Sequence, residues 1–183
     1  MTNPRIPPLP REGRDPRTDD VLSGLRQPDG GELNIFATLA HHPKLLKRWA
    51  AFGGVLLYGG RLSERDRELL IMRTGYLCRA EYEWGQHVAF ARAAGISDEE
   101  IARIAAGPGA EGWSPEDSTL LRAADELHEQ SCISDATWAE LAARYDEQQL
   151  IEICMVVGQY HLVAFTLNSL GVEPEPGLPQ MPA

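Results

Sequence analysis

A glutamate and a histidine lie four residues apart in the middle of the chain, at Glu83 and His87. The apolar residues around them recur at helical spacing, so both side chains are predicted to share one helix face with Trp84 and Val88. A carboxylate beside an imidazole favours the imidazolium form, which can donate a proton near neutral pH. Taken alone, the pair fits either an acid–base site or an ordinary ion pair on a partly solvated helix face.

Glu68 and Arg73 lie on the helix predicted to precede this pair. If the two helices form a hairpin, Glu68 would meet the face of Glu83 and His87 and act as a second general acid or base. Its position also suits a first-turn acid that complements the helix dipole. Arg73 ends an otherwise apolar stretch, so it could bind a substrate carboxylate through two hydrogen bonds or pair with a buried glutamate. The sequence does not decide between the two roles of Glu68, or between the two roles of Arg73.

Three further residues are candidates for substrate binding. Tyr82 and Trp84 flank Glu83 in the sequence. His161 follows Tyr160 in an apolar stretch that is expected to cover the helix of Glu83, so one of these two side chains could line a pocket. A histidine in such a stretch is more often a core residue whose hydrogen bonds are satisfied.

Capping residues divide the chain into a series of predicted helices. Ser63, Ser97, Ser114, Ser134 and Asp146 each precede a helical stretch and can accept a hydrogen bond in its first turn. The predicted helices cover residues 35–40, 43–58, 64–79, 97–106, 115–128, 135–144 and 146–170, together with a helix that contains Glu83 and ends at Ala94. No stretch between Leu33 and Gly171 shows a sustained strand alternation, so the predicted fold is all-α.

The predicted helical domain, residues 33–171, lies between two segments predicted to be irregular. Residues 1–32 form a proline-rich N-terminal arm, and residues 172–183 form a tail that also contains several prolines. The arm holds few large apolar side chains, so it has little core of its own and could wrap over a partner subunit.

The overall composition excludes several classes of protein. A chain of 183 residues with 43% hydrophobic residues suits one globular domain. The formal charge of −10 argues against nucleic acid or an anionic membrane surface as partner. The apolar runs are expected to be too short to cross a bilayer, and the N-terminus has no secretory signal pattern. Three widely spaced cysteines argue against a disulfide framework, which fits a cytoplasmic location.

Cysteine and metal chemistry give the competing hypotheses. Cys78 is a single cysteine at the end of an apolar helix, a place where cysteines are usually core residues, although Arg79 beside it could lower the thiol pKa. Glu68, Glu83 and His87 could together bind a metal, but the Glu-x-x-His spacing of di-iron bundles is absent. We therefore expect no metal.

The placing of Glu68, Glu83 and His87 resembles the carboxymuconolactone decarboxylase and alkylhydroperoxidase D superfamily. Redox members of that superfamily carry a glutamate, a Cys-x-x-Cys pair and a histidine, and the glutamate-to-histidine spacing equals that from Glu68 to His87. The two cysteine positions hold Ala80 and Glu83 here, so the segment is similar to the decarboxylase-type branch. The resemblance covers residues 62–107, and more loosely 45–60 and 158–171.

This resemblance implies an oligomeric helical bundle of the alkylhydroperoxidase D type with about six to eight helices. The oligomer would be a homodimer, homotrimer or homohexamer. The implied activity is cofactor-free decarboxylation, or a related reaction, of a carboxylated lactone or similar metabolite from aromatic degradation. His87 would donate a proton or bind the developing oxyanion, Glu83 would orient it, and Arg73 would bind the substrate carboxylate. The alternatives are a peroxiredoxin-like activity through Cys78 and a non-catalytic oligomer that binds a ligand.

Overall fold

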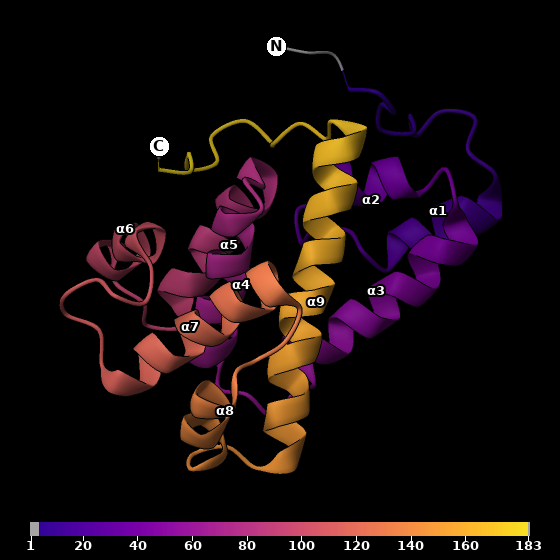
Figure 1. The fold of residues 1–183 in the computed structure, drawn as a ribbon. Helices are drawn as coiled ribbons and strands as arrows, with labels where there is room; N and C mark the ends of the chain where they lie inside the picture. The colour runs from indigo at the N-terminus through magenta and orange to yellow at the C-terminus, as the bar shows by residue number, and fades with distance from the viewer. Residues whose placement is uncertain (1–3, 183) are drawn as a thin grey trace.

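The computed structural model describes residues 4–182, and within them the chain is entirely helical apart from turns and extended connections (Figure 1). Nine α-helices follow one another in this part of the chain: α1 (Pro16–Ser23), α2 (Asn34–Leu39), α3 (Pro43–Tyr58), α4 (Glu64–Leu77), α5 (Glu81–Ala93), α6 (Asp98–Ala106), α7 (Pro115–Gln130), α8 (Asp135–Ala142) and α9 (Glu147–Leu170). The predicted all-α fold is confirmed, with one helix more than the expected range because α1 lies in the arm.

Local capping explains where most of these helices begin. The hydroxyl of Ser63 accepts from the amide of Asp66 at 3.0 Å, and Ser114 does the same for Asp117. At Ser97 and Asp146 the third helical residue also bonds back to the cap, which completes a capping box. Each bond satisfies an amide that the helix itself leaves without a partner.

The central helix of the domain is α4. It packs against α5, α6, α7 and α9, and every residue from Glu68 to Gly75 is buried. The long helix α9 passes between this group and helices α1 to α3 (Figure 1). Its buried side chains, such as Ile153 and Val157, join the main apolar core.

By length and composition α9 could cross a membrane, contrary to the expectation that every apolar run is too short. Half of its most apolar window is buried inside the domain, as in the core helix of a globular fold.

The N-terminal arm is more ordered than predicted. It contains α1, whose N-cap Asp15 accepts from the amide of Arg17, and Leu22 is buried in a small apolar cluster with Ala40 and Leu46. The prediction of an irregular arm is therefore wrong for residues 16–23: Pro16 occupies the first turn of α1, where its missing N–H costs nothing.

The C-terminal tail is irregular, as predicted, but it is fixed to the domain through Glu175. The Glu175 carboxylate accepts from the amide of Asn34 at 2.7 Å and from the hydroxyl of Tyr82 at 2.9 Å.

Candidate active site

The hairpin of α4 and α5 positions the acidic and imidazole groups. Cys78 caps the end of α4, Arg79 turns the chain with a φ of 52°, and α5 begins after Ala80. A left-handed φ is uncommon for arginine, and it allows the chain to reverse within three residues. The reversal brings the face of α5 that carries His87 against the face of α4 that carries Glu68.

The imidazole of His87 contacts the carboxylates of both Glu68 and Glu83, as predicted. His87 Nδ1 lies 2.7 Å from Glu68 Oε2, and His87 Nε2 lies 3.0 Å from Glu83 Oε1. Arg67 Nε donates to the other oxygen of Glu68 at 3.2 Å. The four groups therefore form a line of alternating charge, arginine, carboxylate, imidazolium and carboxylate, in which each charge has an opposite neighbour.

His87 is held in its protonated form by this arrangement. Burial alone would lower the pKa of the imidazole, but hydrogen bonds and charge attraction from Glu68 and Glu83 outweigh it and raise the pKa to about 9. At neutral pH both ring nitrogens then carry a proton, and each proton points at a carboxylate.

The site opens into a pocket of about 590 Å³. Glu83 and His87 lie in its wall, while Glu68 is completely buried behind the imidazole. The remaining wall is mainly apolar and aromatic. Phe90 lies tilted against His87 at a centroid distance of 5.2 Å, and Tyr160 meets the imidazole edge to face at 5.1 Å. A pocket of this size suits a small molecule.

The two carboxylates meet different nitrogens of the His87 ring, and only one of them lines the pocket. Glu83 was expected to orient His87, with Glu68 as a second acid or base. The structure places Glu68 at Nδ1, away from the pocket, where it can fix the ring, and Glu83 on the pocket side. The helical spacing placed Glu83 and His87 on one face, but it could not show which ring nitrogen each carboxylate would meet.

Arg73 does not contact the pocket, so its assignment to substrate binding is wrong. Its guanidinium forms two bonds with Asp125, at 2.6 and 2.9 Å, and donates to the carbonyl oxygens of Ile104 and Ala105 at 2.8 and 3.1 Å. These carbonyls belong to the last turn of α6, whose C-terminus attracts a cation. Arg73 thus joins α4 to α6 and α7, with an aspartate in place of the predicted glutamate.

Of the three other substrate-binding candidates, one lines the pocket and two do not. Tyr82 lines the pocket, as predicted, and its hydroxyl is held between the amide of Ile35 and Glu175. Trp84 is buried in the main core against Tyr76, so its assignment is wrong. His161 is not in the pocket wall either. It faces Cys78 and His128 on another side of the domain.

Several pocket residues were not among the predicted site residues, although Tyr160 was considered beside His161. Tyr160, rather than its neighbour His161, enters the wall, because adjacent residues of a helix point about 100° apart. Residues 24–28 of the arm and Trp49 of α3 also line the pocket. The proline-rich arm carried no chemical motif, and only its contact with α3 and the rest of the fold brings it to the site.

The chain is similar to known proteins both in part of its sequence and in its fold. Residues 43–126 match the model of the carboxymuconolactone decarboxylase family. Comparison with curated proteins gives no significant match.

Two solved structures described as uncharacterized peroxidase-related proteins superpose over nearly the whole chain. The one from Ralstonia eutropha JMP134, described as an alkylhydroperoxidase AhpD core, is 21% identical over 93% of each chain with a TM-score of 0.80. The one from Silicibacter sp. TM1040 is 17% identical over 97% of each chain with a TM-score of 0.81.

A cysteine-to-alanine variant of the debrominase Bmp8, in complex with 2,3,4-tribromopyrrole, has a TM-score of 0.72 at 16% identity, over 96% of this chain and 93% of that one. At these identities the likeness to solved structures establishes the fold alone.

Proposed function

We propose that the chain is a member of the carboxymuconolactone decarboxylase and alkylhydroperoxidase D-like superfamily, which the match of residues 43–126 to the family model supports. On that basis we propose that it is a small-molecule enzyme that uses acid–base chemistry on a carboxylated, unsaturated lactone or a similar metabolite of aromatic degradation. The observation that carries the proposal is the imidazole of His87, held within hydrogen-bond distance of two carboxylates at the wall of a largely apolar pocket. A cytoplasmic location is part of this proposal.

The chemistry follows from where negative charge develops. When the bond to the carboxylate carbon breaks, carbon dioxide leaves and the electron pair moves into the conjugated lactone carbonyl, which gives a dienolate. The apolar wall strengthens the attraction between that anion and the imidazolium. His87 then returns a proton to carbon, either directly or through Glu83, and regains one from solvent.

Glu68 acts in this scheme through His87. It is fully buried and lies outside the pocket wall, so it would position the ring and support its charge without contacting the substrate. Arg67 neutralises its second oxygen. The arrangement resembles the general pattern in which a buried carboxylate fixes the tautomer and orientation of an imidazole.

Arg26 replaces Arg73 as the candidate to hold the substrate carboxylate. It lies in the pocket wall, on the arm, and its guanidinium is partly exposed. It is paired with Asp19 at 2.7 Å and Glu32 at 3.1 Å, which hold it in place and leave other N–H groups of its planar fork for a ligand.

The experiment that tests this function measures carbon dioxide release from carboxymuconolactone by the purified protein. Two histidine variants are compared, His87→Gln in the pocket and His41→Gln on the surface. We expect turnover in the parent and in His41→Gln, and its loss in His87→Gln. Failure of the parent to decarboxylate a panel of carboxylated lactones would contradict the proposal.

Peroxide reduction through Cys78 has less support. The family's redox members use two cysteines, and Ala80 and Glu83 stand at those positions. Burial raises the pKa of the Cys78 thiol to about 11, which leaves little of the reactive thiolate at neutral pH. Hydroperoxide turnover that is lost in Cys78→Ser would favour this alternative, and tight ligand binding without any turnover would favour a binding protein.

We also propose that the chain forms a homo-oligomer, a dimer, trimer or hexamer, through an apolar stripe on α9. Ile151, Met155, Leu162 and Phe165 are 63, 44, 49 and 61% exposed. Together with Gly158, which has open space above it, they repeat at alternating steps of four and three residues. This spacing is typical of helices that pack against each other along their length, as in a coiled coil. The glycine, which has no side chain, allows the backbones of two such helices to approach closely.

Charge on the α9 stripe is expected to separate the subunits. Ile151→Glu should shift the mass measured by light scattering at micromolar concentration from a multiple of the chain mass to one chain, because a carboxylate in an apolar contact loses its hydration. Glu111→Lys, an exposed change outside the stripe, should leave the mass unaltered. A parent protein of one chain mass would contradict the proposal.

A further inference from the structure

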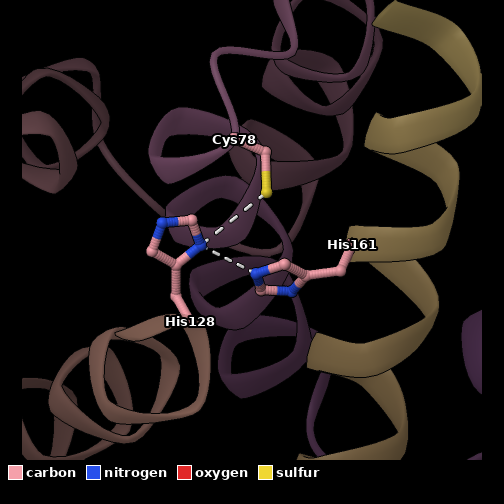
Figure 2. Close-up of side chains that lie close together, drawn as sticks. All are labelled: Cys78, His128 and His161. Carbon is pink, nitrogen blue, oxygen red and sulfur yellow. Dashed lines mark hydrogen bonds between the residues drawn. The ribbon is translucent and has the colours of Figure 1, made fainter. Parts of the chain in front are cut away.

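Cys78, His128 and His161 form a second cluster of chemical groups, apart from the pocket. Figure 2 shows the three side chains converging from the end of α4, the last turn of α7 and the middle of α9. Cys78 Sγ lies 3.9 Å from His128 Nδ1, and His128 Nδ1 lies 2.8 Å from His161 Nε2. One thiol and two imidazoles, all within 4.8 Å of one another, are a ligand set that zinc and similar ions prefer.

We propose that this cluster binds a divalent ion of the zinc type through Cys78 Sγ, His128 Nδ1 and His161 Nε2. Three protein ligands would leave the fourth position of a tetrahedral ion for water. The site would join α4, α7 and α9, which are far apart in the sequence. It is independent of the proposed decarboxylase function, since none of its three residues lines the pocket.

His161 is already oriented for this role. Its Nδ1 lies 2.8 Å from the carbonyl oxygen of Val157, to which only a protonated nitrogen can donate. The proton of the neutral ring is therefore on Nδ1, and Nε2 presents a lone pair to the cluster. A backbone carbonyl that fixes the outer nitrogen in this way is the usual partner of a metal-binding histidine.

The distances require only a small adjustment. Bond lengths of about 2.0–2.1 Å for nitrogen and about 2.3 Å for sulfur place the ligand atoms of a tetrahedral zinc ion roughly 3.3–3.6 Å apart. The two nitrogens must separate slightly and the sulfur must approach. His128 is exposed, near the end of α7, so its side chain can move, and its proton can transfer to Nε2 on the solvent side.

Cys78 is the ligand that would change most on binding. Its backbone is fixed at the cap of α4, where its carbonyl accepts from Asn168 Nδ2 of α9 at 2.9 Å. Cys78 is a free, half-buried thiol, and an ion that binds its sulfur as a thiolate must displace the thiol proton. Zinc binding is therefore expected to release a proton, which calorimetry in buffers of different ionisation enthalpy can count.

The test uses the full chain, freed of metal by chelation and desalting under reducing conditions. Titration with Zn²⁺ should give one ion per chain and raise the midpoint of thermal unfolding, because the ion binds only the folded arrangement. Titration with Co²⁺ should give the visible bands of a four-coordinate ion and the charge-transfer band of a cobalt thiolate.

Matched variants distinguish this site from adventitious binding. Cys78→Ser, His128→Gln and His161→Gln should each weaken Zn²⁺ by about a hundredfold or more, and Cys78→Ser should abolish the charge-transfer band. Cys132→Ser and His41→Gln, at exposed positions elsewhere, should bind as the parent does. Absence of one-to-one binding, or equal affinity in the three site variants, would overturn the proposal.

Discussion

Replacing His87 by glutamine is expected to reduce turnover by about a hundredfold or more, the usual scale for the loss of a general acid. Glutamine is a good helix former, so α5 should persist and circular dichroism should be unchanged. Glutamine cannot carry the charge of the imidazolium or donate a proton to carbon at neutral pH. A variant with full turnover would show that His87 has no part in the reaction.

The two carboxylates should respond differently when each is changed to glutamine. Both changes remove a cause of the raised His87 pKa, so both should move the basic limb of the rate profile to lower pH. Glu68→Gln should act mainly on kcat, because Glu68 does not line the pocket. Glu83→Gln should alter KM as well, because Glu83 does.

The largest loss of stability is expected from Arg73→Gln, at about 3–5 kcal/mol of unfolding free energy. The substitution leaves the Asp125 carboxylate and two carbonyl oxygens of α6 without their donors. Urea unfolding measures the difference. Arg92→Gln, which breaks an exposed pair with Asp98, is the matched control and should cost less than about 1 kcal/mol.

A role for Arg73 in substrate binding would give a different result. If Arg73 held the substrate carboxylate, Arg73→Gln would raise KM and leave stability nearly unchanged. An unfolding free energy within about 1 kcal/mol of the parent would therefore contradict the structural assignment.

Sequence reasoning succeeded where the cause of the structure is local. The caps at Ser63, Ser97 and Asp146 fix the starts of α4, α6 and α9, because a side chain and an amide three residues away are enough to form them. The pairing of Glu83 with His87 follows in the same way from the four-residue repeat of a helix.

The errors concern contacts between residues far apart in the chain. Asp125 lies 52 residues from Arg73, and nothing in the apolar stretch before Arg73 indicates which partner it meets. Tyr160 and His161 were indistinguishable as pocket candidates, because the rotation of α9 about its axis depends on its packing against α4. The cluster of Cys78 with two histidines depends on the same packing.

The central claim is that His87 is an imidazolium at neutral pH, between Glu68 and Glu83. Nitrogen NMR of protein labelled in its histidine rings, assigned by comparison with His87→Gln, measures this directly. A group whose pKa is raised stays protonated up to that pKa, so both His87 nitrogens should keep the imidazolium signature at pH 7 and titrate near pH 9. A neutral ring at pH 7, with a midpoint at or below about 6.5, would contradict the account.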